Sequence, residues 1–164
     1  MSEIALPKVD KSILVKKKEI IKSLSKLINS ENILSEADEV RPYETDALSV
    51  YTQTPLAVVL PENTKQVSDI LKYCYKKDIK VVPRGAGTGL SGGALPLQDA
   101  ILLGLGKFNK ILEIDYENKC VVTQPGVTNL GITHAVEHKG FYYAPDPSSQ
   151  LACSIGGNVA ENSG

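Results

Sequence analysis

The sequence predicts an α+β fold in which a small parallel β-α-β subdomain is followed by a mixed or antiparallel subdomain. A helical stripe separates two short apolar runs, at 55–61 and 79–83, which is the pattern of a parallel β-α-β unit. Later in the chain, strand-like runs at 111–116 and 120–124 flank a short polar turn, as in a hairpin. All 13 glycines follow residue 84, so turns and close backbone approaches are expected mainly in the second half.

The first expected element is an amphipathic helix from Lys11 to near Asn29. Its apolar positions recur at helical spacing, and lysines lie between them. Because Glu19 interrupts the lysines and the net charge of the chain is −1, we interpret the lysine side as a solvated face rather than a nucleic-acid or membrane patch. The apolar positions are Ile13, Leu14, Ile20, Ile21, Leu24, Leu27 and Ile28.

The β-α-β unit follows. Pro55–Pro61 predicts a buried strand, because an apolar run is bounded by prolines. Asn63 or Thr64 then caps a helix, and Ile79–Pro83 restores the strand pattern. The stripe expected on the buried face of this helix consists of Val67, Ile70, Leu71 and Cys74.

The second half predicts shorter elements. Ala100–Leu105 is strand-like and precedes the hairpin. Asn129 is placed to cap a short helix that runs to His138 and ends at Gly140. Pro145–Ser149 cannot be a helix or a central strand, because its prolines lack backbone donors.

The composition is that of an ordinary globular protein. The chain has 164 residues, of which 42% are apolar and 23% charged, and this excludes disordered and collagen-like classes. Cys74, Cys120 and Cys153 form no C-x-x-C pair, so we expect free thiols rather than a disulfide framework or a zinc site. No apolar run approaches the roughly 20 residues of a membrane helix, and residues 1–10 carry no signal-peptide core, so we expect a cytoplasmic protein.

The densest chemical signal is the segment from Arg84 to Ala94, which follows a predicted strand. Five glycines within residues 85–93 let the backbone turn tightly and approach a ligand without a Cβ in the way. Successive free N–H groups in such a loop favour an anion, so we expect a phosphate or diphosphate. Thr88 and Ser91 can add hydroxyl donors, and Arg84 is the one nearby cation in the sequence.

The same loop also fits other patterns. Gly87–Gly92 satisfies the G-x-G-x-x-G string of an NAD-binding Rossmann domain. We disfavour that interpretation because a Rossmann loop opens a helix, whereas Pro96 and a strand-like run follow almost at once. A Walker A loop would need Lys and Ser or Thr where Gly93 and Ala94 stand. A loop that merely turns would not need five glycines in nine residues.

A second segment, Pro145–Gly164, is rich in small and short hydrogen-bonding side chains, which suggests an elongated ligand held at two places. With this segment in view, the chain resembles a known family. Arg84–Pro96, Gln124–Gly131 and Ala144–Gly164, with Arg41–Asp46 upstream, resemble the FAD-binding PCMH-type domain of vanillyl-alcohol-oxidase-like flavoproteins. Within that family the likeness is greatest to the FAD-linked D subunits of glycolate oxidases, and next to D-lactate and D-2-hydroxyglutarate dehydrogenases.

The resemblance implies a division of the chain and a cofactor. Residues 1–34 would be an N-terminal helix and lead-in, and 35–164 the N-terminal part of an FAD-binding domain that is truncated at its C-terminus. Some members attach FAD through a histidine of the phosphate loop, and because residues 84–94 contain none we expect noncovalent FAD.

The implied cofactor-binding residues form two groups. One group wraps the FAD diphosphate, and the other lines the ribityl and isoalloxazine groups. The first group is Arg84, Gly85, Ala86, Gly87, Thr88, Gly89, Leu90, Ser91 and Gly92. The second is Pro145, Asp146, Ser149, Ser154, Gly156, Gly157, Asn158 and Asn162.

The resemblance also implies an activity. The full enzyme would be an FAD-linked 2-hydroxy-acid dehydrogenase that oxidises glycolate to glyoxylate and passes electrons to a partner. Its catalytic base is expected beyond this chain, so we assign no catalytic residue and expect the chain alone to be inactive. The implied partners are a second FAD-domain-like subunit and an iron-sulfur subunit, through which contact with the inner membrane would be peripheral. A D-lactate dehydrogenase and a noncatalytic, incomplete FAD-binding module remain as alternatives.

One string points to a metal. His134–His138 spells H-x-x-E-H, which occurs in inverted zinc proteases. The expected helix is short and no later acidic ligand has a supporting motif, so we interpret both histidines as surface residues and expect no metal site.

Overall fold

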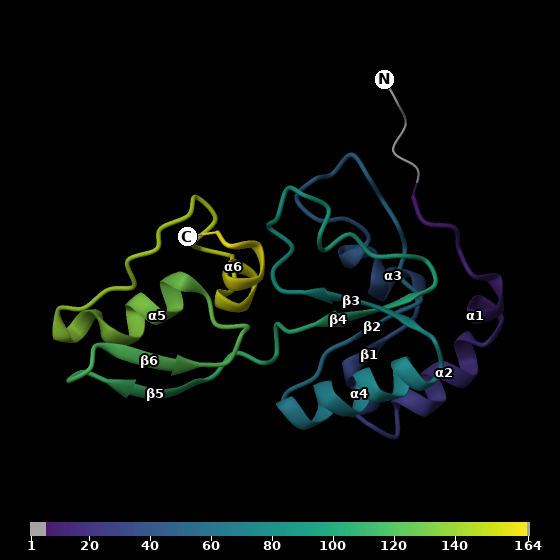
Figure 1. The fold of residues 1–164 in the computed structure, drawn as a ribbon, viewed down its shortest axis with the longest axis horizontal. Coiled ribbons are helices and arrows are strands. Elements are labelled where there is room, and N and C mark those ends of the chain that lie inside the picture. The colour runs from purple at the N-terminus through teal and green to yellow at the C-terminus, as the bar shows by residue number, and fades with distance from the viewer. Residues whose placement is uncertain (1–5, 164) are drawn as a thin grey trace.

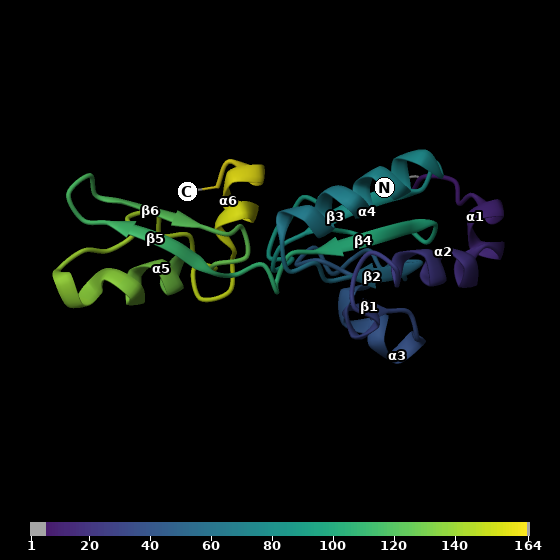
Figure 2. The same ribbon diagram turned by 90° about the horizontal axis from the view of Figure 1, so that it is seen from below.

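A computed structural model describes residues 6–163, while 1–5 and 164, which include the last residue of the glycine-rich second segment, lie outside the described part. The chain forms two lobes side by side (Figures 1 and 2). The first lobe carries a four-stranded sheet and the second a two-stranded hairpin. The helices and strands are α1 (Lys11–Val15), α2 (Lys17–Leu24), β1 (Ile33–Leu34), α3 (Ala37–Val40), β2 (Ala57–Val59), α4 (Thr64–Lys76), β3 (Lys80–Arg84), β4 (Ala100–Gly104), β5 (Ile111–Asp115), β6 (Cys120–Thr123), α5 (Asn129–Val136) and α6 (Ile155–Glu161).

The sheet of the first lobe has the strand order β1-β2-β4-β3. Strands β2, β4 and β3 are parallel, whereas the short edge strand β1 is antiparallel to β2. The predicted β-α-β unit is therefore present with parallel strands, but these strands are not neighbours, because β4 lies between them. All five residues of β4 are buried, as expected for a central strand with both faces covered.

Alternate residues of the central strands face two separate apolar clusters. Ala57 and Ile101 point to the larger cluster, which also receives side chains of α1, α2 and α4. Val58 and Leu102 point to the opposite face, where Val40 of α3 packs. This alternation follows from the two-residue period of a β-strand. The same arrangement is visible in Figure 2, where α4 covers one face of the sheet and α3 lies on the other.

Helix α4 begins where the sequence predicts. The Asn63 side chain accepts a hydrogen bond from the Gln66 N–H at 3.0 Å, which caps the helix. Ile70 and Cys74 are buried, but Leu71 is 43% exposed, so the buried stripe is narrower than expected. Burial raises the pKa of the Cys74 thiol to about 11, as suits an unreactive core residue.

The N-terminal helix differs from the prediction. It is interrupted at Lys16, whose ψ of 6° is not helical, and α2 ends at Leu24 rather than near Asn29. Ile13 and Ile20 both lie in the core, whereas Leu14 is 37% exposed. Residues 11–28 thus share the core of the first lobe, and a domain boundary at residue 34 stays a prediction.

The second lobe contains the predicted hairpin, in which Ile114 of β5 lies opposite Val121 of β6. Helix α5 is capped by Thr128, whose hydroxyl accepts from the Gly131 N–H at 3.0 Å, and not by Asn129 as expected. Gly140 follows with a φ of 77°, a conformation that favours glycine. Residues 145–149 form no helix or strand, as predicted, and α6 was not predicted.

Candidate cofactor site

The glycine-rich loop leaves the carboxyl end of β3. Residues 85–99 contain no helix or strand, so the loop does not open a helix, and the Rossmann interpretation is wrong. Gly87 and Gly92 have φ values of 73° and 77°, which side-chain-bearing residues rarely adopt. The conformation of the loop therefore depends on glycine at these two positions.

Arg84 holds this loop from within. Its guanidinium is buried, donates to the Thr45 carbonyl at 2.7 Å and to the Ala94 carbonyl at 3.4 Å, and lies 5.8 Å from the centre of the Tyr43 ring. A Cβ at Gly87 would come within 2.3 Å of Arg84 Nη2. Arg84 was expected to be the cation that contacts the phosphate. In the structure its side chain instead stabilises the loop on which the phosphate is expected.

Helix α6 brings the second predicted segment against the first. A Cβ at Gly85 would lie 2.3 Å from Ser154 Oγ, at the start of α6. That hydroxyl is buried and has no hydrogen-bond partner among the described residues. A buried hydroxyl without a partner costs about 1–3 kcal/mol, so a ligand that supplies one is favoured here.

The start of α6 is fixed by the chain that precedes α5. Ile155 N–H donates to the Val127 carbonyl at 2.8 Å, and Gly156 N–H donates to the Pro125 carbonyl at 2.9 Å. A Cβ at Gly156 would lie 2.5 Å from the Pro125 Cβ, so the second lobe itself requires glycine at this position. Gly156 therefore has a packing role whether or not it contacts a cofactor.

Two asparagines connect α5, α6 and the proline-rich segment. Asn158 donates through Nδ2 to Asn129 Oδ1 at 2.5 Å, and Asn129 donates to the Pro145 carbonyl at 3.2 Å. Both asparagines are buried. Beside them is an open cavity of about 170 Å³, lined by Tyr143, Pro145, Asn158, Val159, Asn162 and Ser163. Three of the predicted residues, Pro145, Asn158 and Asn162, thus meet at one cavity.

The other predicted residues are placed less tightly. Asp146 is exposed, and the Ser149 carbonyl accepts N–H groups of Ala152 and Cys153 at 2.8 Å in a turn. In the loop, Leu90 is 70% exposed. The remaining residues are exposed to different degrees: Ala86 and Ser91 are exposed, and Thr88 and Gly89 are half-buried, as is Gly157 of α6.

Glu161 lies next to the loop, although the sequence did not predict this contact. A Cβ at Gly93 would lie 2.8 Å from Glu161 Oε1, and one at Gly89 would lie 3.8 Å from it. The carboxylate at the end of α6 therefore lies against the glycine-rich loop. Nothing in the spacing of the sequence indicates this contact, because it depends on how α6 packs.

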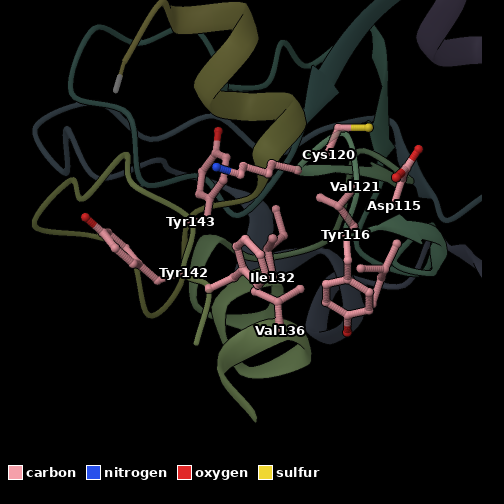
Figure 3. Close-up of a pocket in the computed structure, with 11 residues that line it drawn as sticks. Asp115, Tyr116, Cys120, Val121, Ile132, Val136, Tyr142 and Tyr143 are labelled. Carbon is pink, nitrogen blue, oxygen red and sulfur yellow. The ribbon is translucent and has the colours of Figure 1, made fainter. Parts of the chain in front are cut away.

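A different cavity, of about 90 Å³, lies under the hairpin of the second lobe. Ile132 and Val136 of α5 line one side of it and Val121 of β6 the other (Figure 3).

Within residues 6–163 no three His, Cys, Asp or Glu side chains gather as a metal site, and His134 and His138 are exposed. No helix in the same range is long and apolar enough to cross a membrane.

The fold and the loop define a class of domain in which a glycine-rich loop follows a parallel strand without opening a helix. Residues 55–164 match the protein-family model described as FAD binding domain, and the chain belongs to this family. The resemblance, the α+β fold and the FAD cofactor predicted from the sequence are thereby confirmed, whereas the individual contacts to FAD stay predictions.

Relatives and solved structures agree with this assignment. The chain is 51% identical over 160 residues to glycolate oxidase subunit GlcD of Escherichia coli, covering 98% of this chain but 31% of that protein. It is 33% identical over 138 residues to the mitochondrial D-2-hydroxyglutarate dehydrogenase of Arabidopsis thaliana, covering 84% of this chain and 25% of the relative. The chain thus spans about a third or less of the relatives it matches.

Among solved structures, 4-ethylphenol oxidase from Gulosibacter chungangensis is 28% identical with a TM-score of 0.76, over 94% of this chain and 30% of that one. An alkyldihydroxyacetonephosphate synthase matches with a TM-score of 0.79 at 17% identity, over 96% of this chain and 30% of its own. At that identity the second match shows the fold alone.

Proposed function

We propose that the chain binds one FAD noncovalently between the two lobes, with the diphosphate on the loop Arg84–Gly92 and the ribityl and isoalloxazine groups toward Pro145–Asn162. The observation that carries this proposal is the Ser154 hydroxyl, which is buried without a partner beside Gly85. It lies where the two predicted segments meet, so a ligand that spans both would supply its missing hydrogen bond. The absence of histidine from residues 84–94 supports a noncovalent cofactor.

The chain's own groups would divide the work of binding. Backbone N–H groups around Gly87 and Gly92 would bind the negative ligand, and Arg84 would keep the loop in place through its hydrogen bond to the Thr45 carbonyl. Asn158 and Asn162 would offer amide groups at the cavity in the second lobe. Such groups orient a cofactor and exclude water around it, while the redox chemistry belongs to the cofactor.

The activity of the whole enzyme is part of the proposal. When bound, FAD would accept the two electrons that leave glycolate as it is oxidised to glyoxylate. Glycolate is preferred to D-lactate because the relative at 51% identity is named a glycolate oxidase subunit. Electrons would pass on to a second FAD-domain-like subunit and an iron-sulfur subunit. The enzyme would be cytoplasmic, and any contact with the inner membrane would run through these partners.

Fluorescence titration tests the binding part of this proposal. FAD fluorescence should change on addition of the protein and saturate at one FAD per chain, and NAD should not compete. Competition by NAD at equal concentration would favour a nicotinamide site instead. No response to FAD would contradict the proposed site.

Reconstitution tests the activity. We expect the chain alone, loaded with FAD, to leave glycolate unoxidised, because no catalytic base is assigned within it. Reduction of the bound flavin by glycolate under anaerobic conditions would contradict that expectation and place the base inside residues 1–164. A full-length relative of the chain serves as the positive control, and D-lactate as the competing substrate.

A further inference from the structure

Asp46 is a buried carboxylate that the proposed FAD contacts do not use. Its residue is 5% exposed and lies in the segment that connects α3 to β2. One oxygen, Oδ1, accepts the Leu48 N–H at 2.8 Å. The other, Oδ2, is buried and has no hydrogen-bond partner among the described residues. A carboxylate is rarely buried in this state unless its charge interacts with another group.

The residues on both sides of Asp46 contact the phosphate loop. The Thr45 carbonyl accepts from Arg84 Nη1 at 2.7 Å, and the Ala47 N–H donates to the Gly87 carbonyl at 2.9 Å. The ring of Tyr43 lies 5.8 Å from the Arg84 guanidinium. The segment Tyr43–Ala47 is therefore attached to the loop at its first residue, Arg84, and at its left-handed glycine, Gly87.

The charges of Asp46 and Arg84 complement each other. Burial lowers the pKa of the Arg84 guanidinium, and the negative charge of Asp46 acts in the opposite direction. The described contacts of that guanidinium are otherwise to neutral carbonyls and a ring. A buried cation without a counter-charge is costly, and the neighbouring Asp46, although it forms no direct salt bridge with Arg84, is placed to supply that charge through the segment that contacts the loop.

We propose that Asp46 is a positioning residue for the FAD diphosphate: its charge keeps Arg84 beneath Gly87, and this holds the glycine-rich loop in the conformation that binds. The inference rests on the proposed function, because it assumes that the diphosphate lies on this loop. Asp46 itself need not touch FAD.

Two substitutions distinguish the effect of the Asp46 charge from that of the turn in which Asp46 accepts the Leu48 N–H. Asp46→Asn keeps an oxygen that can accept the Leu48 N–H but removes the charge, because Asn forms the same local turn as Asp. Asp46→Ala removes both. Asp38→Asn, on the exposed side of α3, is the matched control. Each protein is titrated with FAD by fluorescence, and the thermal midpoint is measured without FAD.

If the charge positions the loop, Asp46→Asn weakens FAD binding by about tenfold or more, nearly as much as Asp46→Ala, while the Asp38 control binds as the unmodified protein does. If Asp46→Asn binds FAD normally, Asp46 serves only the turn and the inference is overturned, although FAD binding by the unmodified protein would still support the proposed function. If the unmodified protein binds no FAD, both fail.

Should Asp46→Asn prevent folding, the double variant Asp46→Asn/Arg84→Met decides. Removal of both charges should then restore a folded protein, because no buried charge is left alone. A double variant that is no more stable than Asp46→Asn would overturn the pairing of Asp46 with Arg84.

Discussion

Gly87 offers the sharpest test of the loop, because a matched glycine exists elsewhere. Gly87 and Gly140 both have positive φ values, 73° and 77°, and an alanine in that conformation costs about 1–2 kcal/mol. At Gly140 a Cβ would meet nothing within 4 Å, whereas at Gly87 it would meet Arg84 Nη2 at 2.3 Å. Gly87→Ala must therefore also displace a buried guanidinium.

The displacement breaks the hydrogen bond from Arg84 to the Thr45 carbonyl, which is a bond from a charged donor worth about 1.5–3 kcal/mol. We expect Gly87→Ala to lower the free energy of unfolding by about 3–5 kcal/mol and Gly140→Ala by about 1–2 kcal/mol. Urea unfolding of both variants measures the difference, and FAD titration should show a loss at Gly87→Ala alone. Equal losses of stability in the two variants would refute the described position of Arg84.

Three further predictions concern single side chains. Ser154→Ala should raise the unfolding free energy of the FAD-free protein by about 1–3 kcal/mol, because it removes a buried hydroxyl that has no partner there, yet weaken FAD binding about tenfold; unchanged FAD affinity would contradict the role of the hydroxyl. Glu161→Gln should tighten FAD binding severalfold at low salt and less at about 1 M salt, because the carboxylate beside the loop repels the diphosphate. The control Glu137→Gln, at an exposed residue, should not change FAD binding, and equal or weaker binding by Glu161→Gln would contradict the repulsion. Burial raises the pKa of Asp99, but hydrogen bonds from Lys80 and a backbone N–H outweigh it, so the pKa lies below 3.8 in the folded protein. The contribution of Asp99 to stability is then present above pH 3.8 and is lost as the pH falls through the lower pKa of the folded protein. Urea unfolding at pH 7 and pH 2 should therefore show that the unfolding free energy falls less in Asp99→Asn than in the unmodified protein.

Much of the fold could be predicted because it depends on local patterns. The prolines on both sides of β2 predict this strand, and the capping residue Asn63 predicts the start of α4. The position of β4 could not be predicted, because a buried apolar run is equally suited to any central place in a parallel sheet. Helix α6 was missed since Gly156 and Gly157 are poor helix formers, and the helix is held by hydrogen bonds to Pro125 and Val127.

The candidate site was predictable to a similar extent. Five glycines in one loop indicate close backbone approach. The structure adds a second reason why Gly85 and Gly87 are glycines: a Cβ would clash with Ser154 at the first position and with Arg84 at the second. The inward direction of Arg84 was not predictable, because its acceptors are backbone carbonyls of Thr45 and Ala94. Carbonyl groups are present at every residue, and only the fold decides which ones meet the guanidinium.

One experiment tests directly whether the chain holds FAD without a covalent bond. The purified protein is incubated with excess FAD, passed through a desalting column and examined by visible absorption, and then precipitated with acid. We predict that the bands of oxidised flavin elute with the protein and that acid releases the flavin into the supernatant. Colourless protein after the column would contradict the FAD site, and flavin left in the acid pellet would contradict its noncovalent attachment.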